Sequence, residues 1–193
     1  PKYVSSIDIH CKPGGYCGPE NAGKLHAGAL YDRGVYLYAM GYMGPNNDDM
    51  GRSVCNNIKR KHPQFRPERI LDMGCTVGHS TLPYAELFPQ ASVHAIDVAG
   101  ACVTYAHHRA EGLGLPVHFK QMNAESTRYE DESFDLVVSH ILLHETSNKA
   151  MPKIFHEAYR LLKPGGLMIH ADLPPFDGMD PYTQMILDHD PWF

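Results

Sequence analysis

The sequence predicts an α/β protein with a doubly wound, mostly parallel sheet and a helical extension before it. Residues 68–172 alternate short β-branched runs with amphipathic stretches, the pattern of parallel strands joined by helices on both faces. Residues 1–67 are rich in Gly, Tyr and Asn and contain no convincing strand. Pro63 and Pro67 block helix continuation and set the boundary between these two regions. Residues 173–193, which hold four prolines, form a separate C-terminal segment.

The extension is expected to hold two helices, over residues 21–43 and 47–61. The first follows from a helical stripe of apolar residues, although Gly28 and Gly34 weaken it. Either Asn47 or Asp48 can cap the second helix. Tyrosines on the first helix fit two interpretations, a packed core stripe or a lid over an apolar substrate. The stripe comprises Leu25, Ala29, Leu30, Val35, Leu37 and Met40, and the tyrosines are Tyr31, Tyr36, Tyr38 and Tyr42.

Five strands and their connections fill residues 68–172. The β-branched runs predict strands at 69–73, 92–97, 117–122, 134–139 and 167–171. Amphipathic stretches predict helices at 80–87, 100–111 and 148–162, and residues 163–166 predict a tight turn. After residue 172 we expect at most a short helix near residues 182–187.

Composition narrows the functional class. The net charge is −5 and the basic residues are scattered, so nucleic acid, which needs a basic face, is disfavoured as a partner. No apolar run approaches the ~20 residues of a membrane span and no signal peptide is visible, so we expect a cytoplasmic protein. The five cysteines include no Cys-x-x-Cys pair, and the histidines, including His10 beside Cys11, lack metal-site spacing. No metal is therefore expected, and a small molecule or a protein is the favoured substrate.

The strongest local signal spans residues 70–80, where a buried strand ends in a turn with Gly74 and Gly78 and enters a helix. Such a turn lets the backbone approach a ligand closely, although glycines after a strand can also form only a turn. A dinucleotide fingerprint needs glycines where this chain has Thr76 and His79, because a pyrophosphate lies against them. The pattern therefore disfavours a nicotinamide dinucleotide. S-adenosylmethionine (SAM) has no pyrophosphate, so a turn that binds it can tolerate a small side chain.

A second signal is Asp97, which ends the next strand 23 positions after Gly74 (97 − 74). An acidic residue at that distance is placed to accept hydrogen bonds from both ribose hydroxyls. The alternative is that Asp97 only caps the following helix. Because the glycine turn is in register with it, the ribose role is favoured.

These segments resemble the class I SAM-dependent methyltransferases, particularly the small-molecule enzymes similar to those of ubiquinone and menaquinone biosynthesis. Residues 70–80, 95–98, 122–125 and 133–144 match in order, followed by residues 157–172. The resemblance implies a Rossmann-like sheet of strand order 3-2-1-4-5, SAM as cofactor and S-adenosylhomocysteine as product. It implies that ribose binds Asp97, that Val98 lies against adenine and that Ser139 and His140 lie near the sulfonium. The methionine part of SAM would contact Asp72, Gly74, Cys75, Thr76 and Gly78, and the adenine edge would meet Asn123, Ala124 and Glu125.

The chain departs from the family in two places. Thr76 stands where the family usually has a glycine, which bears on the conformation of the turn. The family also closes its sheet with an antiparallel hairpin of strands six and seven. Nothing after Asp172 predicts two strands, and Pro174, Pro175 and Pro181 argue against them. A fragment of a longer protein is the favoured explanation, in keeping with a first residue other than Met.

Methyl transfer from a sulfonium needs alignment above all, and a general base where the acceptor has a proton to lose. His140 and His144 follow the fourth strand at the carboxyl edge, where open α/β sheets bind ligands, so either is a candidate base. Alternatively, His140 only lines the cofactor and His144 packs in the turn. The predicted function is methyl transfer from SAM to a small-molecule acceptor. The alternatives are a catalytically silent SAM-binding module and, less favoured, a nicotinamide-dependent oxidoreductase.

Overall fold

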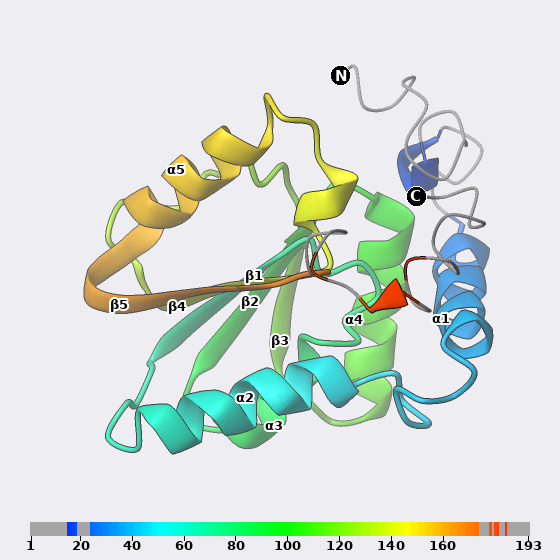
Figure 1. Cartoon of the computed structure of the whole chain (residues 1–193), viewed down its shortest axis with the longest axis horizontal. Coiled ribbons are helices and arrows are strands. Elements are labelled where there is room, and N and C mark those ends of the chain that lie inside the picture. Colours follow the sequence, from blue (N-terminus) through cyan, green and yellow to red (C-terminus); the bar gives the residue numbers. More distant parts are fainter. Residues whose placement is uncertain (1–14, 19–23, 174–177, 179, 182–183, 185–193) are drawn as a thin grey trace.

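The computed structural model describes residues 15–18, 24–173, 178, 180, 181 and 184. At its centre lies a five-stranded sheet of order β3-β2-β1-β4-β5, in which every pairing is parallel (Figure 1). The predicted fold class and strand order are therefore confirmed. The short helix expected near residues 182–187 lies almost wholly outside the described residues, as do His10 and Cys11. The strands are β1 (Arg69–Met73), β2 (Ser92–Asp97), β3 (Val117–Gln121), β4 (Phe134–His140) and β5 (Leu162–Ala171).

Helices cover both faces of this sheet (Figure 1). One face carries α2 (Asp49–Lys61), α3 (Leu82–Leu87) and α4 (Gly100–Gly112), and the other carries α5 (Met151–Leu161). A further helix, α1 (His26–Tyr38), packs against the outer side of α4. Two short 3-10 helices, η2 (Gly15–Cys17) and η4 (Leu143–Glu145), complete the described elements. No helix among the described residues has the length and apolar character needed to cross a membrane.

Alternation along the strands divides the core into two layers. Ile70 of β1 belongs to the cluster with Tyr84 of α3, whereas its neighbour Leu71 belongs to the cluster with Ile154 of α5. All four side chains are almost completely buried. Because both faces of these parallel strands are covered, the strands read as continuous apolar runs, which is why the sequence located them.

The predicted apolar stripe on the first helix is wrong. Three of its members are among the most exposed apolar side chains, since Leu30, Leu37 and Met40 are 68%, 73% and 78% exposed. Of the expected tyrosines, Tyr38 and Tyr42 are also exposed, so a helical core stripe does not describe them.

Small residues, rather than the stripe, bring α1 against its neighbour. A Cβ added to Gly28 would lie 2.3 Å from the Cβ of Tyr105 on α4, so the two helices approach closely at that point. The side chains that α1 buries include Ala27 and Asp32. The glycine that weakened the sequence prediction is therefore the position through which the helix packs.

Two local features differ from expectation. The predicted turn at residues 163–166 belongs to β5 as an irregularity, because the register shifts between the Phe134 and Leu136 pairings and Gly165 has φ +82°. Asp48 occupies the N-cap position of α2, but its carboxylate accepts a hydrogen bond from Arg52 Nε at 2.7 Å rather than from the backbone.

Candidate functional site

The turn after β1 has a backbone conformation that few side chains adopt. Gly74, Thr76 and Gly78 have φ values of +78°, +45° and +79°. A Cβ on Gly74 would lie 2.7 Å from Cδ1 of Leu142, which follows β4. Position 74 therefore requires glycine both for its dihedral angle and for the close approach of the loop after β4.

Asp97 connects this turn to the end of β2. Its Oδ2 accepts a hydrogen bond from the Thr76 N–H at 2.9 Å, and its Oδ1 accepts one from the Ala99 N–H at 2.8 Å. Burial raises the pKa of Asp97, and these two N–H donors oppose that change. The side chain thus orders both loops, but it does not cap the first turn of α4, because the N–H that it binds belongs to Ala99, the N-cap residue itself. Each carboxylate oxygen retains a second lone pair for a hydroxyl donor, so the ribose role stays a prediction.

Asp72 and His140 lie beneath the turn. Asp72 is 2% exposed, and its Oδ2 accepts a hydrogen bond from the Thr81 hydroxyl at 2.6 Å. His140 is 8% exposed, with Nε2 3.2 Å from the Tyr84 hydroxyl and Nδ1 3.5 Å from Asp72 Oδ1. Neither Asp72 Oδ1 nor His140 Nδ1 has a hydrogen-bond partner among the described residues. The burial of His140 favours a supporting role beneath the turn over that of a base.

Ser139 points away from His140, as neighbours on a strand do. Its fully buried hydroxyl lies 2.7 Å from Nδ1 of His170 on β5. Burial lowers the pKa of His170. Ser139 therefore connects β4 to β5 at the carboxyl edge, and its proximity to a sulfonium stays a prediction.

His144 lies beyond this edge, in η4, and is held by the carboxylate of Asp172, which directly follows β5. Its Nδ1 is 2.7 Å from Asp172 Oδ1, and Asp172 Oδ2 accepts a hydrogen bond from the Leu143 N–H at 2.6 Å. The side chain of His144 is 22% exposed. Because a carboxylate accepts but does not donate, Nδ1 carries a hydrogen toward Asp172. Nε2 lies 3.9 Å from Glu145 Oε1.

The expected adenine edge lies beside the end of β2. The Met122 N–H donates to the Asp97 carbonyl at 2.9 Å, which holds the segment after β3 close to Asp97. Asn123 Oδ1 accepts a hydrogen bond from the Glu125 N–H at 2.8 Å, so the amide stiffens this loop. Lys153 Nζ lies 2.8 Å from Glu125 Oε2 and lowers the pKa of that carboxyl. Ala124 is buried, and Val98, after β2, is half-buried.

Tyr31 of α1 lies at the same edge. Its ring centroid is 5.1 Å from that of Tyr16 and 6.0 Å from that of His79, and its hydroxyl interacts with the Thr76 side chain. Burial raises the pKa of Tyr31, and the nearby charges of Glu145 and Asp97 add to the increase. In the sequence Tyr31 was one of four tyrosines with no feature that set it apart. Its contacts with Tyr16, His79 and Thr76 place it at the site.

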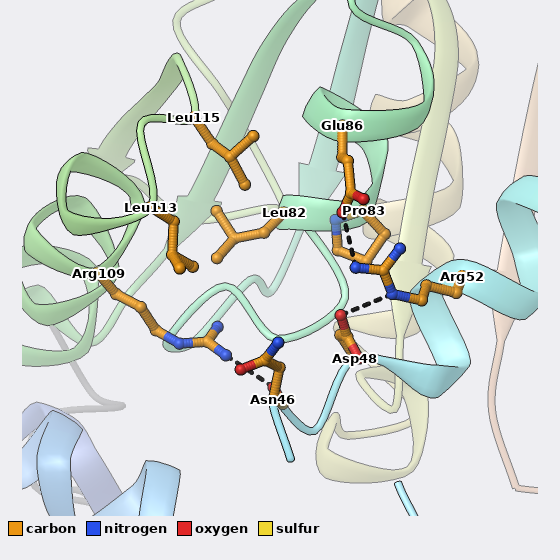
Figure 2. A pocket seen from close by; sticks show the side chains of 9 residues that line it. All are labelled: Asn46, Asp48, Arg52, Leu82, Pro83, Glu86, Arg109, Leu113 and Leu115. Carbon is orange, nitrogen blue, oxygen red and sulfur yellow. Dashed lines mark hydrogen bonds and ion pairs between the residues drawn. The ribbon is translucent and has the colours of Figure 1, made fainter. Parts of the chain in front are cut away.

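A cavity of about 280 Å³ lies elsewhere, between α2, α3 and α4 (Figure 2). Arg52 lies there between Asp48 and Glu86, at 2.7 and 2.6 Å, and Arg109 donates to the Asn46 carbonyl at 2.7 Å. None of the predicted site residues lines it. Within the part of the chain that the structure describes, no group of three His, Cys, Asp or Glu side chains is arranged to hold a metal ion.

The strand order of the sheet, the turn after β1 and the Asp97 carboxylate together define the class of protein. A 3-2-1-4-5 parallel sheet with a glycine turn after β1 and an acidic residue at the end of β2 is the arrangement of the class I SAM-dependent methyltransferases. Residues 70–166 match the family model described as a methyltransferase domain. The chain belongs to this family, and the resemblance found in the sequence is confirmed.

Individual relatives agree with this assignment. The chain is 33% identical to a demethylmenaquinone methyltransferase of Thermus thermophilus, over 56% of this chain and 49% of that protein. It is 32% identical to a malonyl-[acyl-carrier protein] O-methyltransferase of Methylococcus capsulatus, over 66% of this chain and 46% of that protein. The matched part thus spans less than half of either curated relative. A solved structure of a candidate SAM-dependent methyltransferase from Methanococcus maripaludis superposes with a TM-score of 0.63 at 19% identity, over 86% of this chain and 72% of that one, which shows the fold.

Proposed function

We propose that this protein transfers a methyl group from SAM to a small-molecule acceptor and releases S-adenosylhomocysteine. The observation that supports this most is the Asp97 carboxylate, which joins the turn at Thr76 to the end of β2 while keeping lone pairs for two hydroxyl donors. SAM would supply a methyl carbon already activated by its sulfonium. The protein's contribution is then mainly to align that carbon with the acceptor.

The residues at the carboxyl edge fit an adenosyl cofactor. Ribose would bind Asp97, with Val98 and the loop holding Asn123, Ala124 and Glu125 around adenine. The methionine part would lie along the backbone of the turn, whose bend depends on the positive φ values of Gly74 and Gly78. Asp72 and His140 would support the turn from below, because both are almost completely buried.

His144 is the better candidate for a general base. Asp172 fixes the ring by accepting from Nδ1, which orients Nε2 and stabilises the imidazolium that forms when Nε2 takes a proton. The greater exposure of the His144 side chain, 22% against 5% for His140, favours contact with an acceptor. A base of this kind contributes about 10²–10⁴-fold when the acceptor must lose a proton.

The acceptor is proposed by class alone. The names of the two curated relatives specify different acceptors, a demethylmenaquinone and a malonyl group on a carrier protein, so similarity does not choose between them. The net charge of −5, with scattered basic residues, favours neither nucleic acid nor another polyanion.

The test combines cofactor binding with turnover. We expect calorimetric uptake of S-adenosylhomocysteine by the protein, and formation of that product from SAM with one or more members of an acceptor panel. His144→Ala is expected to lower the single-turnover rate by about 10²–10⁴-fold for an acceptor with a proton to lose, without weakening cofactor binding. Asp172→Asn is expected to lower it less, because the amide oxygen still accepts from Nδ1. The control is His156→Ala, at an exposed position of α5.

Each outcome separates one part of the proposal from the rest. Cofactor uptake with no turnover across the panel would support the silent binding module instead of an enzyme. Turnover that His144→Ala leaves unchanged would remove the base and leave the methyltransferase. No uptake by the folded protein would remove the proposed function itself.

A further inference from the structure

A buried polar cluster joins α1 to the turn after β1. Asp32 of α1 is 3% exposed, and its Oδ1 lies 2.6 Å from His79 Nε2 in the turn. Its Oδ2 accepts hydrogen bonds from the Tyr105 hydroxyl at 2.9 Å and from Arg33 Nη2 at 3.1 Å. Its backbone carbonyl accepts one from Asn47 Nδ2 at 2.9 Å. Asp32, through its side chain and its backbone carbonyl, thus collects donors from α1, the loop before α2, the turn and α4.

The ionisation state of Asp32 fixes the direction of the hydrogen bond between His79 and Asp32. Burial alone would raise the pKa of Asp32, but hydrogen bonds from His79, Tyr105 and Arg33 lower it to about 2. Burial lowers the pKa of His79, and its bond to Asp32 opposes that change. Near pH 7 Asp32 is therefore a carboxylate, which only accepts, so His79 donates to it from Nε2. A hydrogen bond to a buried charge is among the stronger single contacts in a protein.

Two further contacts press the extension against the same turn. Tyr31, adjacent to Asp32, stacks on the His79 ring and interacts with the Thr76 side chain. On α2, a Cβ added to Gly51 would lie 2.4 Å from the carbonyl oxygen of Ser80, so the backbones meet there. The turn therefore lies between α1 and α2. Two of its residues, Thr76 and His79, contact neighbouring side chains of α1.

We propose that Asp32 and His79 are positioning residues for the cofactor-binding turn, and that α1 forms part of the SAM site. This inference rests on the proposed function. Asp32 holds His79, and His79 fixes the end of the turn whose other side is held by the bond from Thr76 to Asp97. Tyr31, anchored by the same pair, then forms a wall of the site near Asp97 and Glu145.

The experiment measures the turn with and without cofactor. His79→Ala removes the donor to Asp32, whereas His79→Gln places an amide N–H close to the position of Nε2. We expect His79→Ala to speed hydrogen exchange in peptides covering residues 74–81 of the cofactor-free protein. We also expect it to weaken S-adenosylhomocysteine binding about tenfold, the loss that follows from one hydrogen bond to a buried charge. His79→Gln is expected to restore both quantities to within about threefold, because it restores the donor.

Two controls separate positioning from general stability. His107→Ala makes the same change on an exposed part of α4, where the side chain is 53% exposed. Ile154→Val lowers stability from the α5 side of the core without touching the turn. If Ile154→Val weakens cofactor binding as much as His79→Ala does at an equal loss of thermal stability, the positioning role is wrong. It is also wrong if His79→Ala leaves exchange at residues 74–81 unchanged. If the wild type binds no S-adenosylhomocysteine, the proposed function fails, while the exchange measurement still decides whether the pair holds the turn.

Discussion

Replacing Asp97 by Asn tests the connection between the turn and the end of β2. The carboxylate accepts backbone N–H groups with both oxygens, from Thr76 at 2.9 Å and from Ala99 at 2.8 Å. An amide has one acceptor oxygen, so one of these N–H groups would face an NH2 group instead. Losing such a charge-assisted bond costs about 1.5–3 kcal/mol, and relief of the buried charge offsets part of it. We therefore expect the free energy of unfolding to fall by about 1 kcal/mol.

Cofactor affinity is expected to fall further than stability does. The charged acceptor for ribose is lost, and hydrogen bonds to a charged group contribute about 1.5–3 kcal/mol, which corresponds to about 10- to 150-fold in the dissociation constant of S-adenosylhomocysteine. Calorimetry measures the affinity, and urea unfolding measures the stability of the same samples. Asp131→Asn is the control, because that side chain is 74% exposed and lies away from the turn. Folded Asp97→Asn protein that binds S-adenosylhomocysteine within about threefold of the wild type would refute the ribose role.

Two smaller predictions concern the sheet and its turn. Gly74→Ala is expected to lower the free energy of unfolding by about 1–3 kcal/mol, because φ is +78° and the new Cβ would lie 2.7 Å from Leu142 Cδ1. Gly112→Ala on α4 is the control, because a Cβ added there would meet no atom within 4 Å, and we expect its free energy of unfolding in urea to rise by up to about 1 kcal/mol. If both variants lost the same stability, the close-approach explanation for Gly74 would be wrong. Burial lowers the pKa of His94 to about 4, helped by the charge of His118, so folding favours the neutral ring and stability is lost as pH falls from about 6.5 through 4. His94→Phe is expected to reduce the loss of unfolding free energy between pH 7 and 4.5 by about 1 kcal/mol, a figure already lowered because the ring is partly exposed. The matched variant His118→Phe is expected to retain most of the wild-type pH dependence. Unfolding curves for His94→Phe with the wild-type pH dependence would show that another group causes the loss.

The strands were predictable because their signal is local. Parallel strands buried on both faces must be continuously apolar, and glycines and prolines bound such runs in the sequence. β1 and β2 match their predicted bounds, and β3 and β4 differ by one residue at their ends. The turn after β1 and Asp97 were found for the same reason, since each follows directly from a strand end. In the extension, the second helix was predicted to within two residues of α2. The packing of α1 was not predicted, because α1 packs through Gly28 and Asp32, and an apolar pattern contains no signal for either.

The polar pairs at the site could not be predicted from the sequence. His144 and Asp172 are 28 positions apart, and Asp32 and His79 are 47 apart. No periodicity links such residues, because they meet only when separate strand ends and helices converge at one edge of the sheet. Asp172 had only its place after the fifth strand as a signal. His79 was noticed only as a departure from a glycine pattern.

Thr76 shows how these separate contacts depend on one another. A β-branched residue with φ +45° lies in the left-handed region, which costs about 1–2 kcal/mol relative to glycine. Glycine would remove that strain, but it would also remove the side chain that the Tyr31 hydroxyl contacts. The strained backbone is held by the hydrogen bond from its N–H to Asp97 and by His79, three residues further on, which Asp32 fixes. Ile141, in the loop after β4, also has a positive φ of +52°, so two strained β-branched residues lie at the carboxyl edge. Strain of this kind persists only where surrounding contacts over-determine the backbone. At Thr76 those contacts come from Asp97 at the end of β2 and from the pair of Asp32 and His79, which joins α1 to the turn. The strained threonine and the contact between α1 and the turn therefore depend on each other.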